Sequence, residues 1–115
     1  MLELTEMEWA ALQAADERTF VSVVRNDIVR VEPALVDDPN LLDRLHVAYG
    51  RAKQLGFVHD KAIVEFLYLD ASVPGFYQNP SIAGWLAKPG TTGEERFEMF
   101  LSVLRAKVRD RQENN

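Results

Sequence analysis

The chain contains no cysteine and only two histidines among its 115 residues. Without cysteine, the protein has no disulfide framework, no thiolate zinc site and no cysteine nucleophile. The two histidines, His46 and His59, are too few for a structural zinc site, which wants four nitrogen or sulfur ligands. We therefore predict that the protein binds neither a metal ion nor a cofactor.

Long hydrophobic runs and catalytic motifs are also missing. No apolar stretch approaches the roughly 20 residues that a membrane helix needs. The first twelve residues, MLELTEMEWAAL, lack the basic segment of a secretory signal, so we expect a cytoplasmic protein that is not bound to a membrane. The chain has no glycine-rich phosphate loop, no His-Glu-x-x-His motif and no nucleophile elbow, so we do not expect an enzyme.

The negative charge is concentrated near the N-terminus. The chain carries a net charge of −5, with nine acidic and three basic residues in 1–38 and a net charge of +1 in the remainder. This balance argues against nonspecific nucleic-acid binding, which depends on neutralising phosphates. It suits a basic protein partner that docks on the acidic face, with Glu8 and Asp16 as candidate contacts. The simpler interpretation is a solvated helix face kept soluble by acids.

The first helix is predicted to begin at Thr5, where Thr5 and Glu8 have the spacing of a capping box. It continues until Pro33, because proline disfavours helical geometry in the preceding residue. The stretch Phe20–Val31 is rich in β-branched residues, and two short strands around Asn26-Asp27 are the alternative. We favour a helix, since an isolated hairpin is marginally stable.

The second helix is predicted to begin with Asp38 as N-cap and Pro39 as first helical residue, and to end at Gly56. Its apolar residues recur at helical spacing and are expected to face inward. They are Leu41, Leu42, Leu45, Ala48, Tyr49, Ala52 and Leu55. Gly50 costs the helix about 1 kcal/mol relative to alanine, so we expect a neighbouring helix to approach it closely.

The remaining chain alternates helices with turn signals. The expected elements are a helix over His59–Ser72, a Pro74-Gly75 break, an aromatic loop over 76–79, a short helix begun by Asn79-Pro80 that contains Trp85, and a last helix begun by Thr92 and Glu95. Short connections favour antiparallel neighbours. We therefore predict an all-α fold in one domain, 1–115, with 112–115 frayed. It is a compact bundle of four to five helices with an aromatic Pro-Gly loop before a short Trp-containing helix.

Aromatic residues around the third helix and the following loop provide the best functional lead. Most large aromatics in a small bundle belong to its core. A Pro-Gly-Phe-Tyr loop nevertheless places one or two aromatics at the surface, where tyrosine and tryptophan are favoured interface anchors. We predict that Phe76, Tyr77 and Trp85 contact a protein partner, with local packing as the alternative for Tyr77. The apolar stripes of the first and last helices suit a homo-oligomer as well as a core.

Other candidate groups have simpler explanations. The acidic pairs Asp37/Asp38 and Glu94/Glu95 lie at predicted helix N-termini, where carboxylates cap the helix and favour its dipole. We therefore do not assign them acid–base chemistry. His59 is expected to be a neutral capping or solvent-exposed residue at the start of its helix.

A set of packing residues between 40 and 105 resembles a group of small helical proteins encoded beside type VI secretion spike and effector genes in proteobacteria. In that group a helix ends in a Tyr-Gly-like step, a second helix follows, and a Gly-x-x-Phe-like loop leads into a Trp-containing helix. The matching residues are Tyr49-Gly50, Ala52, Leu55-Gly56-Phe57, Ile63, Phe66, Leu67, Pro74-Gly75-Phe76, Asn79-Pro80, Trp85-Leu86 and Glu95-Arg96.

The resemblance implies a role in the secretion system without an assigned activity. An accessory or co-chaperone factor would bind an effector or its adaptor before loading. An immunity protein, the alternative, would neutralise a toxin effector by binding it directly. Both roles describe a non-enzymatic protein–protein interaction module.

Overall fold

The computed structural model of the chain describes residues 5–14 and 16–113, including side chains outside 11–14 and 108–113. This part of the chain contains six α-helices, two short 3-10 helices and no strand, so the prediction of an all-α fold is confirmed. The elements are α1 (Glu6–Ala14), α2 (Glu17–Val31), η1 (Pro33–Asp37), α3 (Leu41–Gln54), α4 (Asp60–Ser72), η2 (Phe76–Gln78), α5 (Pro80–Leu86) and α6 (Gly93–Glu113). The expected fraying stays a prediction for 112–113, which belong to α6, and for 114–115 it lies outside the described residues.

The single first helix predicted from the sequence is two helices. Asp16 is the N-cap of α2, and its carboxylate accepts a hydrogen bond of 2.9 Å from the backbone N–H of Thr19. The extended backbone of Asp16 (ψ 176°) interrupts the helix, and this explains the extra helix in the bundle. The capping box at the start of α1 is confirmed, with reciprocal hydrogen bonds of 3.1 and 3.2 Å between Thr5 and Glu8.

The β-branched stretch 20–31 is helical, as favoured from the sequence. Its buried apolar side chains, Phe20, Val21, Val24 and Ile28, recur at helical spacing and belong to the core. Burial of this face outweighs the weak helix propensity of valine and isoleucine. The hairpin alternative for this segment is therefore wrong.

α3 begins two residues later than predicted. Asn40 occupies the N-cap position, while the Asp38 carboxylate accepts a hydrogen bond of 2.9 Å from the Asn40 N–H in the preceding turn. Gly56 ends the helical segment with a φ of +90°, as expected for a left-handed C′ glycine. Leu42, expected to face inward, is instead 38% exposed.

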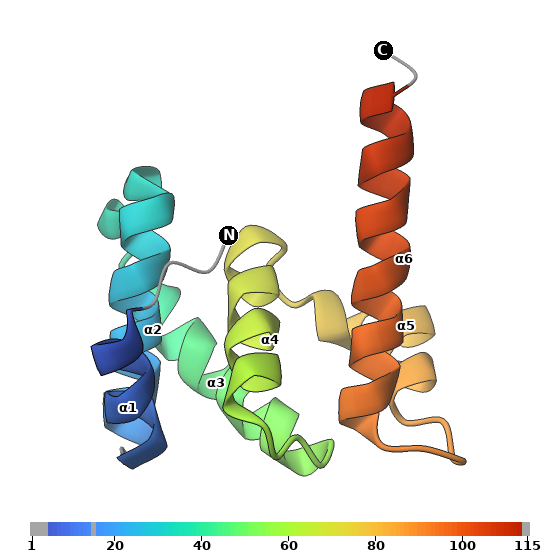
Figure 1. The fold of residues 1–115 in the computed structure, drawn as a ribbon, viewed down its shortest axis with the longest axis horizontal. Coiled ribbons are helices and arrows are strands. Elements are labelled where there is room, and N and C mark those ends of the chain that lie inside the picture. The colour runs from blue at the N-terminus through green and yellow to red at the C-terminus, as the bar shows by residue number, and fades with distance from the viewer. Residues whose placement is uncertain (1–4, 15, 114–115) are drawn as a thin grey trace.

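α4 is the central helix, with eight of its 13 residues buried. Figure 1 shows α1 and α2 on one side of α4, α5 and α6 on the other, and α3 crossing behind. α4 contacts α2, α3 and η2, while α5 packs against α6. The C-terminal half of α6 extends past the other helices (Figure 1).

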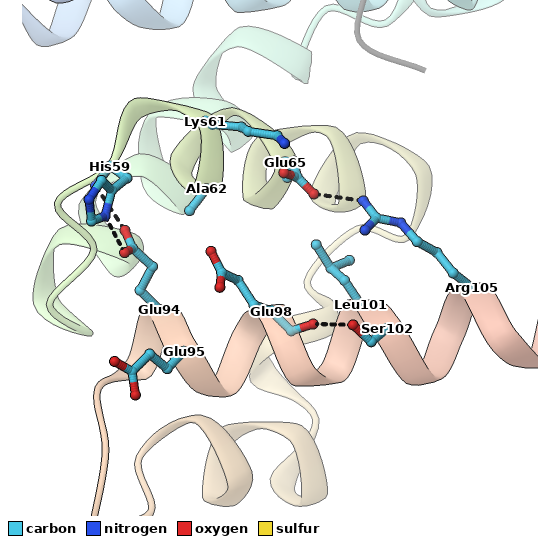
Figure 2. A pocket seen from close by; sticks show the side chains of 10 residues that line it. All are labelled: His59, Lys61, Ala62, Glu65, Glu94, Glu95, Glu98, Leu101, Ser102 and Arg105. Carbon is cyan, nitrogen blue, oxygen red and sulfur yellow. Dashed lines mark hydrogen bonds and ion pairs between the residues drawn. The ribbon is translucent and has the colours of Figure 1, made fainter.

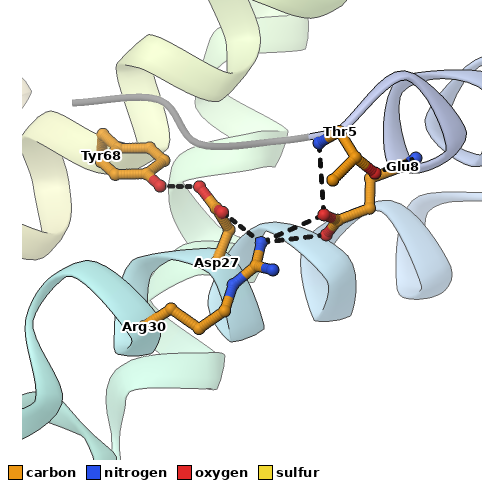
Figure 3. A network of polar contacts seen from close by, with 5 residues as sticks. All are labelled: Thr5, Glu8, Asp27, Arg30 and Tyr68. Carbon is orange, nitrogen blue, oxygen red and sulfur yellow. Dashed lines mark hydrogen bonds and ion pairs between the residues drawn. The ribbon is translucent and has the colours of Figure 1, made fainter.

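A polar network fastens α1 and α2 to α4 (Figure 3). The Tyr68 hydroxyl group of α4 donates a hydrogen bond to Asp27 of α2, whose side chain is fully buried. Arg30 donates to Asp27 and also to both carboxylate oxygens of Glu8 in α1, at 3.1 and 3.2 Å. A buried carboxylate needs such partners, because it loses its hydration on folding. The network therefore places Asp27 inside the bundle and joins three helices.

Tyr68→Phe should lower the free energy of unfolding by about 1.5–3 kcal/mol, because it removes a hydrogen bond to a buried charged group. Urea denaturation followed by circular dichroism measures the change. Tyr49→Phe is the matched control, because the Tyr49 hydroxyl group makes no hydrogen bond to another described residue. Equal effects of the two substitutions would show that the Tyr68–Asp27 contact does not stabilise the fold.

Candidate functional site

Phe76 and Tyr77, predicted as surface contacts, are members of the core. Their side chains are only 5% and 6% exposed. Gly75 adopts a left-handed conformation (φ +71°) that turns the chain inward, and η2 places both rings against Phe66 at centroid distances of 5.0 and 5.4 Å. The expectation that this loop presents its aromatics at the surface is therefore wrong, and local packing explains both rings.

Trp85 of α5 is half-buried and ties α5 to α6. Its indole N–H donates a hydrogen bond of 3.0 Å to the carbonyl oxygen of Arg96. The Arg96 guanidinium group lies over the indole ring, 4.6 Å from its centroid, as in a cation–π interaction. The indole N–H and the face of the indole ring of Trp85 are therefore both in contact with Arg96.

Glu8 and Asp16, the acidic candidates, are engaged in local structure. Glu8 completes the capping box of α1 and pairs with Arg30, and Asp16 caps α2. These contacts hold the pKa of each carboxyl below its ordinary value: the hydrogen bond from the Thr5 N–H acts most strongly on Glu8, and the one from the Thr19 N–H on Asp16. Both lie in the α1–α2 region, which α4 separates from α5 (Figure 1). The structure therefore does not gather the five predicted contact residues into one surface.

A different surface, between α3 and the chain from Pro74 to Ala83, contains two adjoining hollows of about 400 and 560 Å³. They share Val47, Tyr77 and Gln78 in their walls, and we call them together the α3 groove. Tyr77 thus lines this groove although its ring packs in the core. Val47, in the middle of α3, is 60% exposed.

Gly50 lies in the wall of the α3 groove, one helical turn after Val47. The expected close approach of a neighbouring helix is wrong, because a Cβ atom added at Gly50 would meet nothing within 4 Å. Close approach occurs instead at Gly93, the first residue of α6, where an added Cβ would lie 2.4 Å from the carbonyl oxygen of Leu55. Packing within the described part of the chain therefore explains Gly93 but not Gly50.

Asp70 and Arg44 line the other end of the α3 groove. Asp70 is 2% exposed; its Oδ1 accepts a hydrogen bond of 2.9 Å from the Gly75 N–H, whereas Oδ2 is buried without a partner among the described residues. Burial raises the pKa of the Asp70 carboxyl, against the opposing effects of the Gly75 hydrogen bond and the Arg44 charge. Arg44 Nη1 lies 2.5 Å from Asp38 Oδ2, but its buried Nε has no partner in the described structure.

The sequence analysis overlooked Asp70 and Arg44, although one signal was present for Asp70. It lies seven residues after Ile63 and four after Phe66, so it continues the inward-facing stripe of α4. A carboxylate at such a position is expected to be buried. No comparable pattern distinguished Arg44, whose environment depends on the turn that precedes α3.

A second groove separates α4 from α6 and has a volume of about 620 Å³ (Figure 2). Glu65 of α4 and Arg105 of α6 pair across it at 2.8 Å. At its other end Glu94, which is 7% exposed, accepts hydrogen bonds from the backbone N–H groups of Val58 and His59, and its Oε2 lies 2.5 Å from His59 Nδ1. These contacts fasten the start of α6 to the turn between α3 and α4.

His59 is solvent-exposed, which is one of its two expected roles, and Glu94 lies in the first turn of α6 as expected; the contact between them was not predicted. The His59 side chain makes no capping hydrogen bond to α4, and its hydrogen bond with Glu94 and the charge of that carboxylate raise its pKa. Burial tends to raise the pKa of Glu94, but the hydrogen bonds from His59 and Val58 prevail and lower it. The position of Glu94 in a first helical turn was evident from the sequence, but its contact with residues 35 and 36 positions earlier was not.

Comparison of the chain with protein-family models, with curated proteins and with solved structures finds no match. The resemblance to secretion-associated proteins therefore stays a prediction. Among the described residues no group of three or more histidine, cysteine, aspartate or glutamate side chains is arranged to hold a metal ion, and no helix is long and apolar enough to cross a membrane.

The His59–Glu94 pair predicts a pH-dependent stability. A histidine whose pKa is raised on folding contributes stability below its ordinary pKa of about 6.5, and this contribution is lost as pH rises through the folded pKa. Glu94, with a lowered pKa, contributes above its ordinary value of about 4.3 and loses its contribution as pH falls through its folded pKa. The melting temperature should therefore decrease as the pH rises above about 6.5 and through the raised pKa of His59.

His59→Gln should reduce this decrease, because glutamine does not titrate. Thermal melts at several pH values measure the effect, and His46→Gln controls for the other histidine. An unchanged decrease in His59→Gln, together with its loss in His46→Gln, would contradict the assignment to His59.

Proposed function

We propose that this protein is a non-enzymatic protein–protein interaction module and that the α3 groove is its partner-binding surface. The observation that carries the proposal is Gly50, a glycine in the middle of α3 that no internal contact explains. A glycine there costs about 1 kcal/mol of helix stability, and it allows another backbone to approach the helix closely. A partner segment lying in the groove would make use of that space.

The neighbouring residues support the same surface. Val47 presents an exposed apolar side chain one turn before Gly50, and Tyr77 and Gln78 form the opposite wall. An apolar wall with a few polar groups at its ends is the usual composition of a binding cleft. The groove also lies within 40–105, the region on which the resemblance to secretion-associated proteins rests.

On that resemblance, we propose that the partner is a type VI secretion effector or its adaptor, and that the protein acts in the cytoplasm as an accessory or co-chaperone factor. The sequence carries no recognised catalytic motif, and its acidic N-terminal third is unsuited to nucleic acid. Binding a cytoplasmic protein before delivery requires only a stable surface.

Gly50→Ala should stabilise the free protein by about 0.5–1 kcal/mol and at the same time weaken partner binding, because its methyl group fills space in the groove. Gly84→Ala in α5 is the matched control: Gly84 is also helical, and an added Cβ there would likewise meet nothing within 4 Å. Each variant is co-expressed with a type VI secretion effector as the proposed partner, and binding is measured by co-purification and calorimetry.

Weakened binding in Gly50→Ala with unchanged binding in Gly84→Ala supports the groove. Equal binding by both variants, or no complex with the wild-type protein, would contradict the proposal. Co-expression with a toxin domain separates the two secretion roles: protection of the cells identifies an immunity protein, whereas loss of effector delivery without protection identifies an accessory factor.

A further inference from the structure

We propose that one face of α6 binds the same face of a second copy of this chain, with the two helices antiparallel. The α6 face consists of Met99, Val103 and Ala106, which follow one another at spacings of four and three residues and therefore lie on one side of the helix. The inference does not depend on the proposed function, because none of these residues lines the α3 groove. Three properties of α6 identify the partner as a second copy.

The first property is an exposed apolar strip. Phe97, in the same helix, is fully buried, whereas Met99 and Val103 are 49% and 54% exposed. A single exposed apolar side chain is ordinary in a folded protein. Two such side chains four residues apart are neighbours on the helix surface and form a continuous strip. Burial of this strip against another apolar surface would stabilise a complex.

The second property is the length of α6 beyond the rest of the bundle. α5 packs against the first half of α6, where the Trp85 indole N–H donates to the carbonyl oxygen of Arg96. The C-terminal half extends past the other helices (Figure 1). Helices in proteins derive most of their stability from packing of an apolar face. A second α6 would supply that packing along the helix.

The third property is the charge order along α6, which selects the antiparallel direction. Residues 94–98 carry a net charge of −2, and residues 105–111 carry a net charge of +3. The helix dipole favours this order only within the first and last turns, whereas Glu98, Arg105 and Lys107 lie further inside the helix. In an antiparallel pair each acidic half lies beside the basic half of the other copy. A parallel pair would bring like charges together.

These properties together define a closed dimer. The helix has 21 residues and is about 31 Å long, so two antiparallel copies can overlap over most of their length. A two-fold axis near the middle of α6 places Met99 of one copy beside Val103 of the other. The same patch is used on both copies, so the interface is complementary to itself and assembly stops at two.

Paired charge reversals test both the partner and the direction. One variant carries Glu95→Lys and Glu98→Lys, and the other carries Lys107→Glu and Arg109→Glu. Each variant alone brings like charges together in an antiparallel dimer, so its dimer Kd should rise by about tenfold. An equimolar mixture restores opposite charges at both ends and should regain nearly the wild-type Kd. Sedimentation velocity of the full chain at several concentrations measures the Kd.

Circular dichroism shows whether each variant stays helical, and recovery in the mixture shows that both variants remain competent to bind. Arg105 is left unchanged because it pairs with Glu65 within the chain. A wild-type chain that stays monomeric at every concentration would overturn the inference and leave the α6 face to solvent or to a different protein. Variants that dimerise as well as the wild type would also contradict it, because a parallel pair places like charges together in all three proteins.

Val103→Lys tests the apolar centre of the interface independently of its charged ends. The Kd should rise by at least about tenfold, because each copy loses a buried valine and gains an unpaired ammonium group. Val36→Lys in η1 is the matched control, since Val36 is also a half-exposed valine and lies outside α6. Equal dimerisation of Val103→Lys and the wild type would contradict the α6 face.

The outcomes are separate from those of the proposed function. Gly50→Ala changes the α3 groove and should leave the dimer Kd unchanged, so loss of effector binding in that variant says nothing against the dimer. A monomeric wild-type chain that still binds an effector would remove the dimer and leave the α3 groove standing.

Discussion

The contact of Phe66 with four other aromatic rings is the constraint on which the arrangement of the second half of the chain depends. Its ring centroid lies 5.0–5.4 Å from those of Phe57, Phe76, Tyr77 and Phe97. These rings come from the turn after α3, from η2 and from α6, so one side chain of α4 determines where three segments pack. Aromatic pairs at such distances are favourable beyond the area that they bury.

The α3 groove is a consequence of this packing. η2 turns inward to place Phe76 and Tyr77 against Phe66, and the chain from Pro74 to Gln78 forms one wall of the groove opposite α3. The same turn carries the Gly75 N–H to Asp70, which holds one oxygen of a buried carboxylate and leaves the other unused. The surface assigned to binding and the buried, unpartnered oxygen of Asp70 thus arise from one feature of the core.

The local features of the sequence that involve a few neighbouring residues were predictable. Such features depend on backbone groups within about three residues. The structure contains three of them: the capping box of Thr5 and Glu8, the Asn79 cap of α5 and the left-handed Gly56. The division of the first helix was missed, because Asp16 can either continue a helix or cap a new one. The side chain prefers the cap because it satisfies a free N–H group.

The sequence by itself determined that the protein is all-α. It also placed helices over most of the segments in which apolar residues recur every three to four positions, because helix periodicity and capping act over short distances. Only the tertiary structure decided that Phe76 and Tyr77 are buried, that Glu94 holds His59, and that Arg44 and Asp70 line one groove. These outcomes depend on contacts between distant segments, for which a single sequence contains no periodic signal. Which side of a loop faces the core is therefore decided by the helices that pack against it.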